Sequence, residues 1–66
     1  MRSVCLSTAY RLADNGRVLL GSYISEVAVS GDQIRLTTLM GESITLSGSI
    51  RHVDLLNNEI LIDPAS

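Results

Sequence analysis

Turn motifs divide this 66-residue chain into short segments, and their spacing constrains the fold more than any other feature. The turn signals are Asp14-Asn15-Gly16, Gly21-Ser22, Ser30-Gly31-Asp32, Met40-Gly41-Glu42 and Asn57-Asn58. They recur about every eight to twelve residues, and the segments between them lack a helical period of apolar residues. Short strands separated in this way are typical of all-β barrels. We therefore predict an all-β domain with a small, antiparallel, barrel-like fold of the SH3/KOW-like type.

The alternation of apolar and polar residues predicts six or seven strands in a single domain over residues 1–66. Residues 4–63 are expected to form the barrel, whereas residues 1–3 are a candidate extension or tag. The clearest alternation places Ile34, Leu36 and Thr38 on one face, and Ile44 and Leu46 on one face of the next strand. The predicted strands cover residues 4–10, 17–20, 23–30, 33–39, 43–47, 50–55 and 59–62.

The first predicted strand holds the only cysteine, Cys5. Its two faces carry Leu6, Thr8 and Tyr10 on one side, and Cys5, Ser7 and Ala9 on the other. We assign the first set to the core, which leaves the second as a row of small side chains that another backbone can approach. Three interpretations then fit the thiol: an inert buried sulfur, half of an intersubunit disulfide, or a metal ligand completed by a second subunit.

A chain of this length buries only a modest core, and a single cysteine excludes an internal disulfide. Self-association is the favoured source of extra stability. Adjacent apolar residues support this, because neighbours in a strand point to opposite faces and a small barrel has only one interior. Some members of these pairs must face outward, and we assign them to a subunit interface. The pairs and runs are Leu19-Leu20, Leu39-Met40, Leu55-Leu56 and Ile60-Leu61-Ile62.

The net charge of −2 gives no electrostatic reason to expect nucleic acid or an anionic membrane as a partner. No apolar run has the length of a transmembrane helix, and the N-terminus lacks the hydrophobic segment of a signal peptide. We therefore expect a cytoplasmic protein. In the reducing cytosol Cys5 would stay a thiol, which is the form that a metal can use.

A shared metal site follows if Cys5 meets its own copy across a twofold axis. Two thiolates with two backbone or amine nitrogens would give a set of four sulfur and nitrogen donors. Planar, nitrogen-rich geometry favours Ni(II) or Cu(II), whereas thiolates also accept Zn(II) in a tetrahedron. The residues themselves leave the choice of metal open.

Other chemistry is less well supported by the sequence. His52 has no second histidine or spaced partner, and Asp54 and Asp63 fit turn or rim carboxylates. A cysteine hydrolase would need Cys5, His52 and an orienting group to converge, and no motif surrounds them. We therefore do not expect an enzyme. A purely structural or regulatory homodimer stays open.

An RNA-binding barrel is the main alternative module. Such barrels use stacked aromatic side chains and a basic groove. This chain offers two tyrosines, at positions 10 and 23, and dispersed arginines. The arginines at 11, 17, 35 and 51 are better interpreted as solvated charges on strand faces, which also discourage edge pairing.

Three regions of the chain, at its start, middle and end, resemble the CooT family of small cytoplasmic nickel-binding proteins. They are Cys5-Leu6-Ser7-Thr8-Ala9-Tyr10, then Val29-Ser30-Gly31-Asp32 with Ile34-Arg35-Leu36-Thr37, and Val53-Asp54-Leu55 with Ile60-Leu61-Ile62. The resemblance covers residues 4–62. It implies a homodimer of small barrel-like subunits that binds Ni(II) through Cys5, in support of carbon monoxide dehydrogenase maturation or nickel handling. Family members have also been labelled predicted RNA-binding proteins.

The start of the chain departs from the family pattern. In the family, the cysteine directly follows the initiator methionine, whereas Met1-Arg2-Ser3-Val4 precedes Cys5 here. A cysteine at the second position offers a terminal amine, its own amide nitrogen and its thiolate, but Cys5 has only amide nitrogens nearby. An amide must lose a proton before it ligates, which makes binding harder near neutral pH. Our hypothesis is that Val4 stands where a native methionine belongs.

Overall fold

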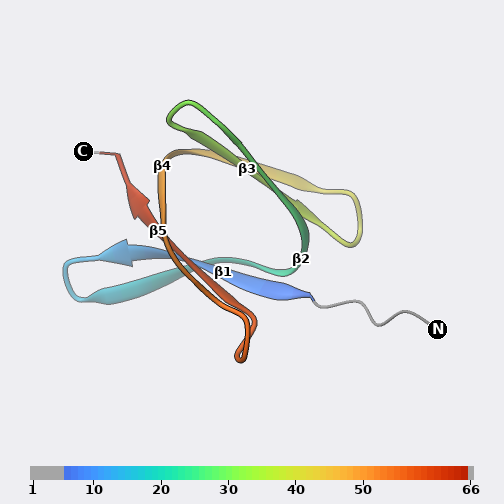
Figure 1. Ribbon diagram of the computed structural model, residues 1–66, viewed down its shortest axis with the longest axis horizontal. Helices are drawn as coiled ribbons and strands as arrows, with labels where there is room; N and C mark the ends of the chain where they lie inside the picture. The colour runs from blue at the N-terminus through green and yellow to red at the C-terminus, as the bar shows by residue number, and fades with distance from the viewer. Residues whose placement is uncertain (1–5, 66) are drawn as a thin grey trace.

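The computed structural model describes residues 6–65, and all of its regular structure is β (Figure 1). No helix between these residues could cross a membrane. The chain forms five strands, whose order and bounds are β1 Ser7–Ala13, β2 Gly16–Ser30, β3 Gln33–Thr38, β4 Ser43–Asp54 and β5 Glu59–Pro64. The all-β prediction is confirmed.

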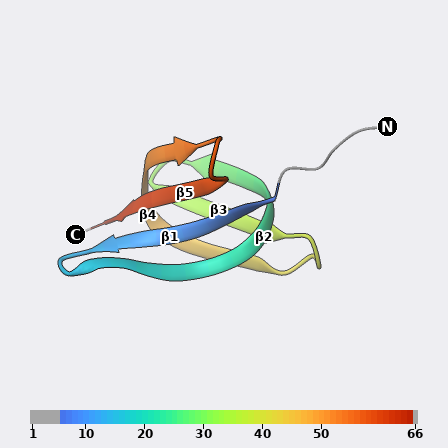
Figure 2. The same ribbon diagram turned by 90° about the horizontal axis from the view of Figure 1, so that it is seen from below.

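The strands close into a hydrogen-bonded barrel in the order β1-β2-β3-β4-β5 (Figure 2). Four neighbouring pairs are antiparallel, as predicted. The fifth pair differs: β1 and β5 run parallel, with Thr8 beside Glu59 and Arg11 beside Ile62. This parallel seam closes the ring, so each described strand is paired on both sides.

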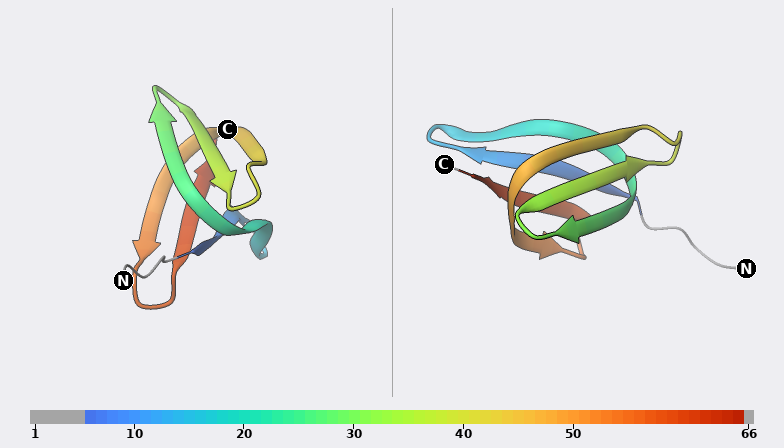
Figure 3. Two further views of the ribbon diagram at one scale, coloured as in Figure 1. Left: turned by 90° about the vertical axis from the view of Figure 1, so that its right-hand side faces the viewer. Right: turned by 90° about the horizontal axis from the view of Figure 1, so that it is seen from above.

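The number of strands is five rather than the six or seven predicted. The predicted break at Gly21-Ser22 and the predicted boundary between the strands 43–47 and 50–55 both fall inside long strands, β2 and β4, which curve around the ring in Figure 3. Each long strand pairs with one neighbour along its first part and with another along its second. Glycine at these positions therefore turns a continuous strand around a narrow barrel instead of ending it.

Six apolar side chains form the core. They are Ala9, Ile24, Ile34, Leu36, Ile60 and Ile62, with Leu20, Val27, Ile44 and Leu46 packed against them. The inward positions predicted for β3 and β4 are confirmed, because Ile34 and Leu36 are fully buried and Ile44 and Leu46 contact the core. The barrel therefore has an aliphatic interior, as a chain without Phe or Trp requires.

The predicted orientation of the first strand is wrong. Ala9 was assigned to an outer row of small side chains, but it is 0% exposed and lies in the core. It pairs with Gly21 on one side and Ile60 on the other. A Cβ at Gly21 would lie 3.0 Å from the Cδ1 atom of Ile44. Small residues face inward here because isoleucines from other strands already fill the narrow interior.

Candidate functional site at the start of strand β1

The predicted metal ligand, Cys5, lies outside the described residues. It directly precedes Leu6, the first described residue, and β1 begins one residue later at Ser7. The relevant surface is therefore the end of the barrel at which β1 begins.

Two turns flank the start of β1. On one side, the Thr8 amide donates to the Asn58 carbonyl at 2.8 Å, which joins β1 to the β4–β5 turn. On the other side, Ser7 pairs with Ile24, and Ile24 pairs in turn with Thr38 at the end of β3. Figures 1 and 2 accordingly show the start of β1 between the β3–β4 and β4–β5 turns.

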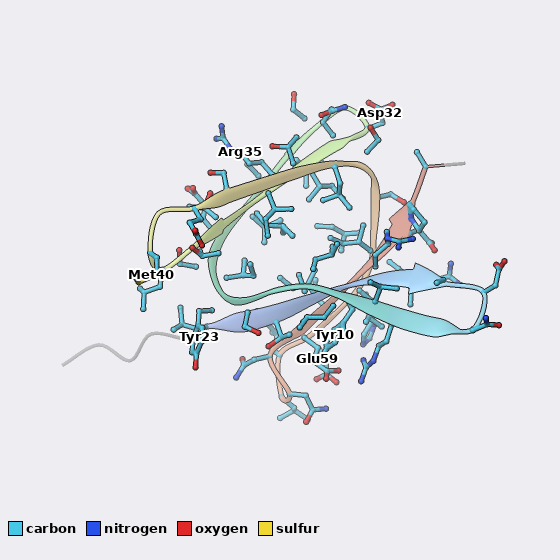
Figure 4. The ribbon with its side chains drawn as sticks, turned by 180° about the vertical axis from the view of Figure 1, so that it is seen from behind. Tyr10, Tyr23, Asp32, Arg35, Met40 and Glu59 are labelled. Carbon is cyan, nitrogen blue, oxygen red and sulfur yellow. The ribbon has the colours of Figure 1, made fainter. Side chains whose placement is uncertain are left out.

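Large apolar side chains are exposed at both turns. Tyr23, Leu39 and Met40 are 65%, 60% and 85% exposed, and we call this group the Tyr23 patch. Leu55 and Leu56, in the β4–β5 turn, are 82% and 94% exposed and form the Leu55 patch. Figure 4 shows Tyr23 and Met40 at the same edge of the barrel. The prediction that part of the adjacent apolar pairs lies outside the barrel is confirmed.

Tyr23 has an unusual backbone that the sequence did not predict. Its φ is 58°, in the left-handed region that bulky residues rarely adopt. Its carbonyl accepts a 2.9 Å hydrogen bond from the Leu39 amide, which ties the bend of β2 to the β3–β4 turn. Strained conformations of this kind persist where the surrounding structure enforces them, and they cluster at functional sites. The neighbouring Gly21-Ser22 was the only sequence signal of an irregularity.

The carboxylate of Asp54 is used within the β4–β5 turn. It accepts hydrogen bonds from the backbone amides of Leu56 and Asn57 at 3.0 and 3.1 Å, and from the Asn57 side chain at 2.8 Å. The Asn57 side-chain bond is the main cause that lowers the pKa of Asp54 below its usual 3.8, and the nearby His52 contributes least. The predicted turn role of this carboxylate is confirmed.

His52 and Asp63 do not form a metal centre with other side chains that the structure describes. His52 is exposed on β4 opposite Leu61, and Asp63 accepts a 2.6 Å bond from Arg51. No group of three or more His, Cys, Asp or Glu residues converges between residues 6 and 65. A metal held by described side chains of a single chain is therefore not supported.

Between residues 6 and 65, the aromatic and basic side chains do not form a stacking platform. Tyr10 lies beneath the Arg17 guanidinium, whose carbon is 4.3 Å from the centre of the ring. The arginines at 17 and 51 are engaged in ion pairs with Glu59 and Asp63. An RNA-binding surface of stacked aromatics is not favoured by this arrangement.

Two shallow depressions lie on the outer surface, away from the start of β1. The first, of about 280 Å³, is lined by Ala28, Ser30, Gln33, Arg35 and Thr45. The second, of about 400 Å³, follows the β1–β2 hairpin over residues 13–18. Both are open, and neither contains His52 or Asp54.

Comparison with known proteins adds a family and a fold. The family model described as CO dehydrogenase accessory protein CooT matches residues 4–63. A crystal structure from Carboxydothermus hydrogenoformans, whose protein carries a provisional CooT assignment, superimposes with a TM-score of 0.85 at 14% identity. That match covers 94% of this chain and all of the other, and it shows a common fold. A comparison with curated protein sequences gives no match.

Proposed function

Because the chain belongs to the CooT family of CO dehydrogenase accessory proteins, we propose that it binds Ni(II) through Cys5 and serves nickel delivery or storage for that enzyme. The match to the family over residues 4–63, which includes Cys5, is the observation that carries the proposal. The protein acts in the cytoplasm on nickel as its cargo, together with proteins that mature nickel enzymes. It is not itself an enzyme.

The site is shared between two copies of the chain, each of which supplies one Cys5 thiolate. One thiolate cannot complete a four-coordinate site, and the described side chains of one chain offer no cluster of further ligands. A twofold axis near the start of β1 would bring the two sulfurs together and leave nitrogen donors of the neighbouring backbone to complete the set. This donor set also suits Cu(II) and Zn(II). Ni(II) is proposed among them because the resemblance to the family implies it.

The four residues before Cys5 affect the strength of binding. The family model begins its match at residue 4, so Val4 occupies the first matched position. A chain that starts at that position with methionine would place the cysteine second and offer an amine to the metal. The intact mass of the protein purified from its source shows whether the chain begins at Met1 or at position 4. We expect the chain with the longer start to bind Ni(II) more weakly, because it must use deprotonated amides.

Titration with Ni(II) tests the proposal. We expect thiolate-to-metal absorption to grow until about one Ni(II) is bound for every two chains. Cys5→Ser should abolish this absorption and leave the far-ultraviolet circular dichroism unchanged, because the sulfur is not expected to fill the core. Ser7→Ala, two residues away, is the matched control and should bind as the native chain does. Undiminished binding by Cys5→Ser would exclude Cys5 as the ligand, and loss of the fold would mark it as a packing residue.

A further inference from the structure

The β1–β2 hairpin contains an asparagine followed by a glycine, a pair that the candidate site does not use. Its two-residue loop, Asp14-Asn15, joins Ala13 to Gly16, and these two residues are paired across the hairpin. All four residues are exposed, and Figure 1 shows the hairpin projecting from the ring on the side away from the start of β1. A backbone in such a position opens locally at a small cost in free energy. The Asn15 side chain and the Gly16 amide can therefore reach each other.

We propose that Asn15 is a site of spontaneous modification, at which the chain loses the side-chain amide through a cyclic imide with Gly16. Asparagine is among the thermally labile residues. The backbone nitrogen of Gly16 bonds to the Cγ atom of Asn15 while the Cγ–Nδ2 bond breaks, and the amide leaves as ammonia with the proton that the nitrogen gives up. Water then opens the imide at either carbonyl. One opening leaves an aspartate, and the other leaves an isoaspartate, whose backbone runs through the side-chain carbon.

The surroundings of Gly16 favour ring closure. The Asn15 side chain has to approach the backbone nitrogen that follows it, and a Cβ on that next residue would hinder the approach, but glycine has none. The space is open, since a Cβ added at Gly16 would meet no atom within 4 Å. An open depression follows the hairpin over residues 13–18, so water reaches the loop. The Asn15 side chain also forms no hydrogen bond with another described residue that would hold it away.

The two other asparagines are held in the β4–β5 turn, and neither precedes a glycine. The Asn57 side chain donates a 2.8 Å hydrogen bond to the Asp54 carboxylate, and its backbone amide donates one of 3.1 Å. Asn58 precedes Glu59, whose backbone is paired with a strand on both sides. These restraints must break before either ring can close, so both residues should react more slowly than the hairpin asparagine. They are internal controls for the effect of the hairpin.

The products differ from the native chain in charge and, for isoaspartate, in the length of the backbone. A carboxylate at position 15 lowers the formal net charge by one, from −2 to −3. Isoaspartate adds one carbon to the backbone of the two-residue loop, so the pairing of Ala13 with Gly16 cannot keep its geometry. The next residue, Arg17, forms an ion pair with Glu59. The modification therefore acts on the hairpin and its link to β5, at the opposite end of β1 from the proposed nickel site.

Incubation of the full chain at physiological temperature and neutral pH, followed by peptide mapping with mass spectrometry, tests the proposal. We expect the acidic product at Asn15 to exceed that at Asn57 or Asn58 by about tenfold or more, because each restraint that must break raises the barrier. Aspartate and isoaspartate should both form at Asn15. Equal modification of the three asparagines would overturn the role of the hairpin. Aspartate without isoaspartate would show that water cleaves the amide directly, which would overturn ring closure.

Two variants test the same site through the charge of the intact protein, measured by ion-exchange chromatography. Asn15→Gln keeps an amide in the loop but must close a larger ring, so the acidic form should appear about tenfold more slowly or less often still. Asn57→Gln is the matched control and should acquire charge at the native rate. Circular dichroism confirms that both variants are folded. An Asn15→Gln chain that acquires charge as fast as the native chain would overturn the proposal.

Discussion

The guanidinium of Arg17 lies over the ring of Tyr10, with 4.3 Å between its carbon and the centre of the ring. The same guanidinium donates to the Glu59 carboxylate at 3.2 Å. These three side chains belong to β2, β1 and β5, so the contact spans the parallel seam at which the barrel closes. Figure 4 shows Tyr10 and Glu59 together on the outer face of this seam.

Arg17→Ala should therefore lower the free energy of unfolding by about 1 kcal/mol, because it removes a cation–π contact and a partly screened ion pair. Urea unfolding measures the change. Arg35→Ala is the control, since Arg35 forms no ion pair among the residues described, and its effect should stay within about 0.5 kcal/mol. Equal losses in both variants would show that the seam contact adds nothing.

Gly48→Ala should destabilise the barrel much more, by about 3 kcal/mol. A Cβ at this position would overlap the backbone oxygen of Asp63, and the backbone of a paired strand cannot move away without losing hydrogen bonds. Gly41→Ala is the control for the backbone conformation, because the φ of Gly41 is 89° and that of Gly48 is 158°, both positive, but the space around Gly41 is open. It should cost about 1 kcal/mol. Similar thermal midpoints for the two variants would contradict the close approach at Gly48.

The sequence predicted the parts of this fold that depend on local pattern. Alternation is regular along β3, so the burial of Ile34 and Leu36 followed from it directly. Alternation identifies the two faces of a strand but not which face points inward. On β1 we assigned the face with the larger side chains to the core, and that assignment was wrong. Ala9 is buried because side chains from distant strands fill the space around it, which no local pattern encodes.

Two further predictions, the number of strands and the exposed apolar residues of the candidate site, also depended on what a local sequence pattern can show. A glycine is compatible with the end of a strand and with a bend inside one. The sequence at Gly48 therefore did not show that β4 continues past this residue with its backbone close to that of β5. The exposure of residues in Leu39-Met40 and Leu55-Leu56 was predicted from the alternation within strands. The physical reason differs, because both pairs lie in turns and all four side chains are exposed there. Their grouping around the start of β1 could not be predicted, since it depends on the order in which the strands close the ring. The expectation that the metal is nickel came from the family resemblance, because the residues themselves left the choice of metal open.

The stability of the β4–β5 turn should depend on pH through Asp54. Its hydrogen bonds to Asn57 lower the pKa in the folded state below the usual 3.8, so the folded chain binds that proton less readily than the unfolded chain. The stabilisation is therefore fully present above pH 3.8 and is lost as the pH falls through the lower folded value. Asp54→Asn should be less stable than the native chain at pH 7, and urea unfolding should show this difference shrinking as the pH falls below 3.8.

The affinity for Ni(II) should fall steeply on acidification, because a proton competes with the metal for each thiolate. The usual pKa of a cysteine thiol is about 8.5, so below that value each coordinating thiolate costs about tenfold in affinity per pH unit. Two Cys5 thiolates at a shared site therefore predict a loss of at least about a hundredfold per pH unit, whereas one thiolate without amide ligands predicts about tenfold. Calorimetric titrations between pH 6 and pH 8 measure this slope, and amide ligands would steepen it further. A slope near tenfold would contradict a site shared by two sulfurs, even if Cys5→Ser abolishes binding.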